Sequence, residues 1–296
     1  MSWQGKILRV NLTTHEITPE ALNMEWAKDY IGERGLGTKY LWENMDPKAD
    51  AMAPDNVLIF ATGPLTGTNA STSGRYAVIT KSPLTGAIAC SNSGGKFGAE
   101  LKYAGFDLLL VEGQSEKPVY LLIEGDEISL APAEKIWGKT VWETDEWIKK
   151  QHHNPMLKIA TIGIAGERGA RYASVVNDLH RAAGRSGVGT VMGSKNLKAV
   201  AVRGTGGVKV KDPKRFMTVT QEMKNLLAEH TGGLTKYGTN AMMDTMQEFG
   251  GLPTRNFQEV QFEGADKVDA KAMMKTDDTG HTNLLTNKAC FGCTDR

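Results

Sequence analysis

The first residues that suggest chemistry form a glycine-rich run with a single arginine between Gly63 and Gly98. It contains Ser73-Gly74-Arg75, Lys81-Ser82-Pro83-Leu84-Thr85-Gly86 and Asn92-Ser93-Gly94-Gly95-Lys96. Glycine lets backbone N–H groups approach a ligand closely, and a guanidinium group offers a planar fork that suits phosphate. The run therefore fits an anion site, although tight turns in a β-rich domain with Arg75 on the surface would give the same pattern.

A second cluster of similar composition runs from Asn177 to Gly189. Arg181 and Arg185 flank Ala182-Ala183-Gly184, which places basic side chains beside free backbone donors and suits a phosphorylated cofactor. The simple nucleotide motifs do not apply. Gly95-Lys96 is followed by Phe97 rather than Ser or Thr, and Gly187-x-Gly189-x-x-x-Gly193 misses the dinucleotide spacing by one residue. The pattern therefore favours phosphate binding, but through neither of these two standard nucleotide-binding motifs.

The third feature is Cys290-x-x-Cys293, which in an intracellular chain is typical of a metal or redox site. Two thiolates alone do not complete the ligand set of a zinc ion or an iron–sulfur cluster, because each normally takes four ligands. We interpret the pair as part of a cluster-binding motif, and a free dithiol or no function remains open.

Strands and turns must position these clusters. The pattern of apolar residues predicts strands over 6–10, 16–18, 57–61, 75–80, 108–112, 119–123, 127–130, 158–164 and 199–203, and helices over 23–31, 36–45, 98–103, 140–150 and from 213 to about 230. Residues 1–208 thus read as an α+β, strand-rich domain. Residues 209–296 read as the beginning of a helical domain, truncated after the Cys-x-x-Cys motif, because they contain few bulky residues for a core of their own.

Composition excludes several classes of protein. The 296 residues carry a formal net charge of +1, so no overall field favours nucleic acid or an acidic membrane. No apolar stretch is long enough to cross a bilayer, and the N-terminus does not read as a signal peptide. Three cysteines exclude a disulfide-stapled secreted fold, and the expected location is the cytoplasm.

Taken together, the motif blocks resemble the tungsten-containing aldehyde ferredoxin oxidoreductase family. The resemblance is carried by Gly74-Arg75, by 81–86, by Asn92-Ser93-Gly94-Gly95 and by Leu101-Lys102-x-Ala104-Gly105-Phe106-Asp107. It is carried equally by Asn177-Asp178-x-His180-Arg181-Ala182-Ala183-Gly184-Arg185 and by 192–199. Proteins of this family are roughly twice as long as this chain, so the resemblance is to an N-terminal half.

The resemblance implies a two-sheet β-rich domain that cradles a tungstopterin or molybdopterin cofactor, with two pterins per metal, and a nearby 4Fe–4S cluster. It implies that backbone carbonyls of Asn92 and Ala182 face a magnesium ion and that Cys290 and Cys293 are the first two cluster ligands. The residues that it assigns to pterin and phosphate binding are Arg75, Asn92, Gly94, Gly95, Arg181, Ala182, Ala183, Gly184 and Arg185.

The resemblance also implies an activity, namely oxidation of an aldehyde to a carboxylic acid with a ferredoxin-like iron–sulfur protein as electron acceptor. The family's third cluster cysteine would fall four residues after Cys293, and its acid–base residues would lie in the missing half. We therefore expect no catalytic acid or base within these residues. A homodimer is left open. The alternative function is a non-enzymatic pterin-binding or assembly module that is inactive without that half.

Overall fold

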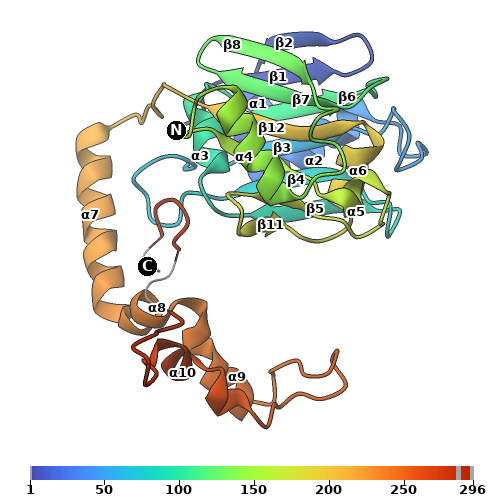
Figure 1. Cartoon of the computed structure of the whole chain (residues 1–296). Coiled ribbons are helices and arrows are strands. Elements are labelled where there is room, and N and C mark those ends of the chain that lie inside the picture. Colours follow the sequence, from blue (N-terminus) through green and yellow to red (C-terminus); the bar gives the residue numbers. More distant parts are fainter. Residues whose placement is uncertain (1, 285–287, 294–296) are drawn as a thin grey trace.

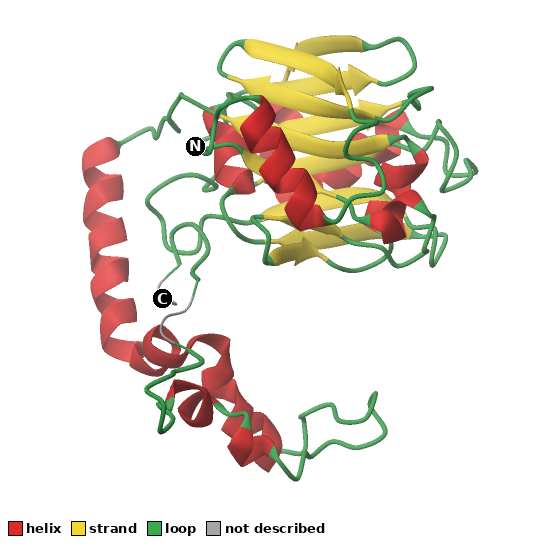
Figure 2. Cartoon of the chain, viewed as in Figure 1, coloured by secondary structure: helices red, strands yellow, loops and turns green. Residues whose placement is uncertain are grey.

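The computed structural model describes residues 2–284 and 288–293, and residues up to Arg203 form two stacked six-stranded mixed sheets (Figures 1 and 2). The first sheet has the order β2-β1-β6-β3-β4-β5 and the second has the order β11-β10-β9-β12-β7-β8. Neighbouring strands are antiparallel except for the parallel pairs β1–β6 and β12–β7. The predicted α+β fold with two sheets is confirmed.

The strands of the first sheet are β1 (Lys6–Asn11), β2 (Glu16–Ala21), β3 (Leu58–Thr62), β4 (Tyr76–Lys81), β5 (Ile88–Ser93) and β6 (Leu108–Glu112). Those of the second are β7 (Val119–Glu124), β8 (Glu127–Pro132), β9 (Lys158–Thr161), β10 (Val175–Asn177), β11 (Arg181–Ala183) and β12 (Leu197–Arg203).

The continuous apolar run of β3 is explained by burial of both faces of the first sheet. Leu58 and Phe60 point into the core between the two sheets, whereas Ile59 and Ala61 point to the helices that cover the outer face. Successive side chains of a strand alternate between faces, so a strand buried on both sides is apolar at every position. The core between the sheets is the main hydrophobic cluster of the domain.

Helices cover the outer faces and close the ends of this core. Helices α1 (Met24–Tyr30) and α2 (Glu33–Asn44) pack on the first sheet, and α4 (Val141–Gln151) packs on the second. Helices α3 (Phe97–Tyr103) and α6 (Val188–Ser194) contribute side chains to the inter-sheet core, and α5 (Ile164–Glu167) contacts α6. Asn23 caps α1 at the start of the predicted helix, its Oδ1 accepting from the N–H groups of Glu25 and Trp26.

Residues from Pro213 onward form helices that extend away from the sheets (Figure 1). The helices are α7 (Pro213–His230), α8 (Gly232–Tyr237), α9 (Met243–Glu248) and α10 (Ala270–Met274). The described residues after Lys211 include only four buried ones, namely Thr220, Gly238, Thr254 and Ala270. The domain boundary near residue 208 remains a prediction. None of the helices in the described ranges is long and apolar enough to cross a membrane.

Candidate functional site

The two motif clusters meet where the edge strands of the two sheets lie side by side. Strand β5 ends the first sheet and β11 ends the second, and the two strands are in contact (Figure 1). The backbone N–H of Arg185 donates to Oγ of Ser91 at 3.0 Å, which joins the cluster around Asn92 to the cluster around Arg181. We call this contact region of β5 and β11 the seam.

Arg75 is oriented at the seam by a chain of two hydrogen bonds. Its Nη1 donates to Oδ1 of Asn92 at 2.8 Å, and Nδ2 of Asn92 donates to Oε2 of Glu33 at 3.1 Å. Burial raises the pKa of Glu33, while the hydrogen bond from Asn92 and the charge of Arg75 act in the opposite direction. The carboxylate therefore fixes the Asn92 amide so that its oxygen faces Arg75, whose side chain is exposed.

A second anchor, Asn177 at the end of β10, is only 1% exposed and makes four hydrogen bonds. Its Oδ1 accepts from the hydroxyls of Tyr76 at 3.0 Å and Ser93 at 2.6 Å. Its Nδ2 donates to the carbonyl of Gly94 at 2.9 Å and to Oδ2 of Asp178 at 2.8 Å. A single amide therefore ties the second cluster to the first inside the seam.

A side chain at Gly94 or Gly95 would displace a neighbouring segment. Gly95 has a φ of +88°, and a Cβ placed on it would lie 2.2 Å from Oδ2 of Asp178. That same carboxylate oxygen accepts from the N–H groups of Lys96 at 2.6 Å and Phe97 at 3.3 Å, at the start of α3. A Cβ on Gly94 would lie 2.6 Å from Sγ of Cys290. Both glycines thus allow a close approach, of Cys290 at Gly94 and of Asp178 at Gly95.

The cysteine motif folds back against these glycines. The N–H of Phe291 donates to the carbonyl of Gly95 at 2.9 Å, and the N–H of Thr72 donates to the carbonyl of Gly292 at 2.7 Å. Gly74 is also covered, because a Cβ there would lie 2.8 Å from Cβ of Phe291. Arg181 donates to the carbonyl of Lys288, just before the motif. The structure therefore brings all three predicted features into one region.

The residues predicted to bind the cofactor differ in how far they are exposed at the seam. Arg75, Ala182, Gly184 and Arg185 are exposed, and Asn92 and Arg181 are half-buried. Gly94, Gly95 and Ala183 are buried, so any contact from Ala183 to a ligand would be through its backbone. Each of β5 and β11 is an edge strand, which leaves alternate backbone groups without a partner in its own sheet. The roles of all these residues remain predictions.

Cys290 and Cys293 are half-buried free thiols. Within residues 2–284 and 288–293, no group of three or more His, Cys, Asp or Glu side chains is placed to hold a metal ion. The assignment of the two cysteines to a cluster remains a prediction.

Three residues that position this region receive no role from sequence reasoning. Asn177 and Asp178 lie in the second motif, whose composition assigns them no role, and Glu33 lies outside every motif. A signal for Asn177 exists, since it follows the apolar pair Val175-Val176 and its position at a strand end favours a buried, satisfied amide. Nothing near Glu33 in the sequence indicates its bond to Asn92, because that contact joins residues 59 positions apart.

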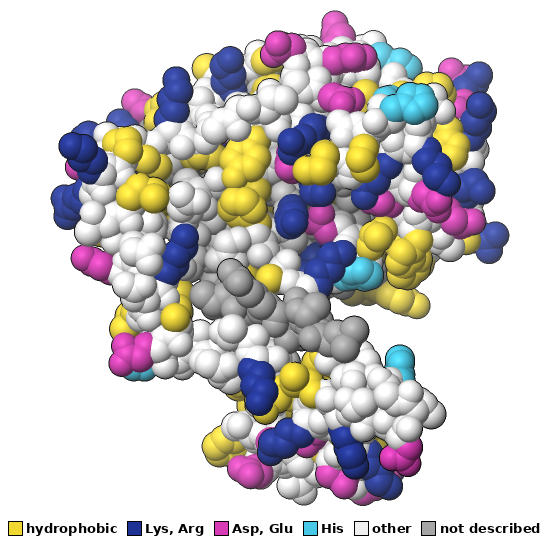
Figure 3. All heavy atoms as spheres, turned by 60° about the vertical axis from the view of Figure 1, so that its left-hand side comes forward, with side chains coloured by type: hydrophobic (Ala, Val, Ile, Leu, Met, Phe, Trp, Pro, Cys, Tyr) yellow, Lys and Arg dark blue, Asp and Glu magenta, His cyan; other side chains and the backbone are white. Residues whose placement is uncertain are grey.

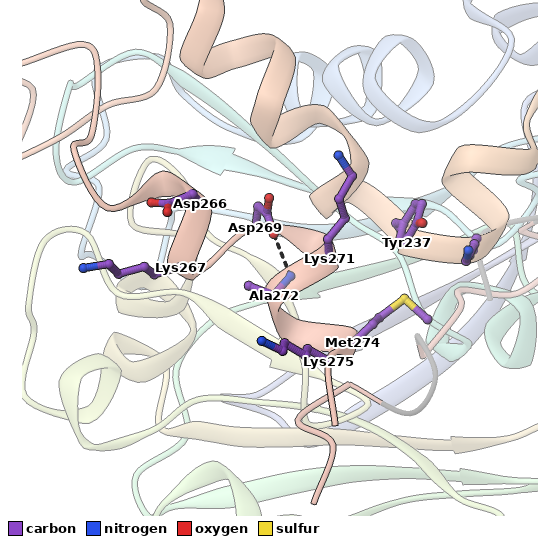
Figure 4. A pocket seen from close by; sticks show the side chains of 9 residues that line it. Tyr237, Asp266, Lys267, Asp269, Lys271, Ala272, Met274 and Lys275 are labelled. Atoms are coloured by element: carbon purple, nitrogen blue, oxygen red, sulfur yellow. Dashed lines mark hydrogen bonds between the residues drawn. The ribbon is translucent and has the colours of Figure 1, made fainter. Parts of the chain in front are cut away.

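A cavity of about 890 Å³ lies apart from the seam, between α8 and α10 (Figure 4). Side chains of both signs line it, including Asp266, Lys267, Lys271 and Lys275, and Asp269 Oδ1 accepts from the N–H of Ala272 at 2.7 Å. None of the predicted site residues lines this cavity, so it does not change the location of the candidate site.

Comparisons with known proteins give the family. Residues 7–204 match the family described as aldehyde ferredoxin oxidoreductase, N-terminal domain, and residues 218–296 match the one described as aldehyde ferredoxin oxidoreductase, domains 2 and 3. In structure, the chain is similar to the active-site complex BamBC of benzoyl coenzyme A reductase with 1,5-dienoyl-CoA. The TM-score is 0.84 and the identity 32%, over 99% of this chain and 46% of the other.

Curated relatives agree with these matches. The chain is 51% identical to the tungsten-containing aldehyde ferredoxin oxidoreductase of Pyrococcus abyssi and 49% identical to that of Thermococcus kodakarensis, in both cases over 98% of this chain and 47% of the relative. It is 33% identical to an aliphatic sulfonate oxidoreductase, WOR-like subunit, of Pyrococcus furiosus, over 87% of this chain. The chain thus spans about half the length of these relatives. By sequence and by fold, it belongs to the aldehyde ferredoxin oxidoreductase family.

Proposed function

We propose that the chain supplies the N-terminal, cofactor-binding part of a tungsten- or molybdenum-pterin oxidoreductase that converts an aldehyde to a carboxylic acid. Water supplies the added oxygen, and the aldehyde and the water together release two electrons and two protons. A 4Fe–4S cluster, held in part by Cys290 and Cys293, would supply one-electron transfer to a ferredoxin-like acceptor. One observation carries the proposal: the two Arg- and Gly-rich motifs and the cysteine motif, distant in the sequence, meet at the seam.

The residues at the seam fit a phosphorylated pterin. Arg75 and Arg185 are exposed cations that can bind phosphate bidentately, and the edge strands offer backbone carbonyls for a magnesium ion at Asn92 and Ala182. When bound, the pterin-held metal supplies the two-electron redox chemistry, while the protein binds and orients the group. Arg181, Ala182, Ala183, Gly184, Gly94 and Gly95 would line the cradle mainly through their backbones.

The side chain of Arg75 is pre-oriented by hydrogen bonds in the absence of a ligand. Because Glu33 orients Asn92 and Asn92 orients Arg75, the guanidinium loses less rotamer freedom when it engages a phosphate. The amide oxygen of Asn92 carries no net charge. The hydrogen bond from Arg75 to it therefore leaves the positive charge of Arg75 uncompensated and available to an anion. Glu33 thus acts through Asn92 as a positioning residue.

The cysteine motif fits two ligands of a 4Fe–4S cluster, whose usual set is four cysteines. Cys290 lies against Gly94, so the cluster and the pterin would be close neighbours on opposite sides of the Gly94–Gly95 backbone. The proposal requires two further ligands from beyond the described residues, and it assigns no catalytic acid or base to them. In this arrangement residues 1–208 form the cradle and residues 209–296 begin a helical domain.

The test is metal and pterin content of the complete enzyme carrying Arg75→Ala or Arg185→Ala, with the exposed Arg168→Ala as control. We expect tungsten or molybdenum and pterin to fall in the first two variants and to stay at the unsubstituted level in the control. Unchanged occupancy in Arg75→Ala and Arg185→Ala would refute the cradle.

Two further measurements separate the parts of the proposal. Cys290→Ser should remove the visible thiolate-to-iron absorbance, and intact absorbance would refute its role as a ligand. Aldehyde-dependent reduction of a viologen dye by the complete, metal-loaded protein tests the activity. A loaded protein that oxidises no aldehyde would favour the non-enzymatic pterin-binding or assembly module.

A further inference from the structure

Phe291, which lies between the two cysteines of the motif, packs against the sheet domain through an aromatic contact. Its ring meets the ring of Tyr103, at the end of α3, edge to face, with the centroids 6.2 Å apart and the planes at 74°. This geometry is favourable because the positive edge of one ring faces the negative face of the other. Gly74 lies close to the same residue, since a Cβ placed on it would be 2.8 Å from Cβ of Phe291. The motif is therefore held by side-chain packing as well as by backbone hydrogen bonds.

Tyr103 also contacts the loop on which the motif rests. We call this loop, residues 66–74, the seat loop. The hydroxyl of Tyr103 donates to the carbonyl of Gly67, in the seat loop, at 2.7 Å. The N–H of Thr72, in the same loop, donates to the carbonyl of Gly292, in the cysteine motif, at 2.7 Å. One side chain thus contacts both the motif and the loop that supports it.

The position of Tyr103 is fixed by its neighbours in and after α3, which form ion pairs. Nζ of Lys102 donates to Oδ1 of Asp107 at 2.5 Å, and both side chains are at most 1% exposed. Oε1 of Glu100 accepts from Nη1 of Arg203 at 2.9 Å. Separating a buried pair of charges is costly because each would be left without its partner. The end of α3 is therefore a rigid support for the ring of Tyr103.

The segment that leaves the sheet domain also runs against Tyr103. The N–H of Gly206 donates to the carbonyl of Tyr103 at 2.9 Å, and a Cβ on Gly204 would lie 2.2 Å from the carbonyl carbon of Tyr103. These glycines belong to the connection between β12 and α7. In the space-filling view the molecule is hollowed between the sheet domain and the helices that follow it (Figure 3). The outgoing connection and the returning cysteine motif thus meet the sheet domain at the same residue.

We propose that Tyr103 is a positioning residue for the cysteine pair, because its ring seats Phe291 and so sets where Cys290 and Cys293 lie relative to the sheet domain. The inference rests on the proposed function for what the cysteines bind, and on the contacts above for how they are held. Metal ligands bind well only when neighbouring residues hold them at defined distances and directions. Tyr103 supplies this restraint through Phe291.

The first experiment measures access to the thiols in the 296-residue chain without metal. Alkylation by iodoacetamide, followed by mass spectrometry, gives a separate rate for each cysteine. Cys90, which packs against the core on the outer face of the first sheet, is the internal reference. In Tyr103→Leu, which removes the ring but keeps an apolar side chain, Cys290 and Cys293 should react roughly threefold faster or more, and Cys90 at its usual rate.

Two variants serve as controls in the same assay. Tyr103→Phe keeps the ring and loses only the hydroxyl, so the rates at Cys290 and Cys293 should stay within about twofold of those of the unsubstituted chain. Tyr172→Leu removes an exposed tyrosine elsewhere and should change no rate. Equal rates in Tyr103→Leu and Tyr103→Phe would overturn the positioning role. Acceleration of Cys90 by the same factor would overturn it too, because it would indicate general loosening of the fold.

The second experiment uses the complete protein, purified without oxygen, and compares iron content and the electron paramagnetic resonance spectrum of the reduced sample. Tyr103→Phe should give the unsubstituted spectrum, whereas Tyr103→Leu should lose iron or change the line shape. Identical spectra and iron contents in the two variants would count against the positioning role. If the unsubstituted complete protein holds no iron, the cluster part of the proposed function fails, and the alkylation rates alone decide the role of Tyr103.

Discussion

Asn177 reaches across the seam to the carbonyl of Gly94, at 2.9 Å, and so joins the two sheets at their shared edge. The two residues belong to different sheets and to different motifs, and both are buried. Because the same amide also holds Ser93 and Tyr76, its position determines the backbone on which the proposed cofactor and cluster sites depend.

Replacing Asn177 by Ala should lower the free energy of unfolding by about 2–4 kcal/mol, because buried hydroxyl and carbonyl groups lose their partner. Urea unfolding of the 296-residue chain measures this. Asn225→Ala is the matched control, since Asn225 is exposed on α7, and its change should stay within about 0.5 kcal/mol. An Asn177→Ala chain as stable as the control would contradict the bridging role.

Gly95→Ala and Gly105→Ala separate backbone strain from steric conflict. The two glycines have similar φ values, +88° and +93°, but a Cβ on Gly105 would meet no atom within 4 Å, whereas one on Gly95 would meet Asp178. Gly105→Ala should therefore cost about 1–2 kcal/mol, the ordinary penalty of a left-handed residue. Gly95→Ala should cost clearly more in the same unfolding assay. Equal costs would show that Asp178 does not constrain the position.

The sequence predicted the parts of the fold whose signals are local. The apolar runs of β3 and β6 and the helix α7 lie where the pattern predicts them. In the structure Asp212 caps α7 and Pro213 is its first residue. These elements are specified by residues within a few positions of one another, so burial and capping can be read along the chain.

Strands β5, β10 and β11 and helix α6 were not predicted, for a physical reason. The inward residues of β5 are Ala89, Ser91 and Ser93, which lack the bulky apolar alternation of a strand. Buried serines are acceptable there because partners from the other sheet satisfy them, as Asn177 does for Ser93. The motif residues were found from their glycine and arginine content, but their meeting at the seam depends on contacts between distant segments.

Lys195 should make stability depend on pH in the alkaline range. Burial lowers its pKa to about 8, although its Nζ donates to the carbonyls of Pro54 at 3.0 Å and Gly113 at 2.8 Å. Between about pH 8 and the ordinary lysine pKa of ~10.4, the unfolded chain binds more protons than the folded chain, so stability rises with pH.

The comparison with Lys195→Met isolates this effect from other groups that titrate in the same range. From pH 7.5 to 10, the unfolding free energy of the unsubstituted chain should rise by about 2 kcal/mol relative to that of the variant. Urea unfolding at several pH values gives both curves. Parallel curves would mean that Lys195 keeps an unperturbed charge in the folded state.

Gly94→Ala should loosen the cysteine motif without unfolding the sheets. A Cβ at this position would lie 2.6 Å from Sγ of Cys290, so the segment 290–293 must move away. Its movement would break the bonds from Phe291 N–H to Gly95 and from Thr72 N–H to the carbonyl of Gly292. Hydrogen exchange followed by mass spectrometry should show faster exchange in peptides that contain these two amides.

Gly207→Ala, where a Cβ meets nothing within 4 Å, serves as the control and should leave both rates unchanged. If protection persists in Gly94→Ala, the motif does not rest on Gly94, and the close approach of the proposed cluster and pterin sites fails with it.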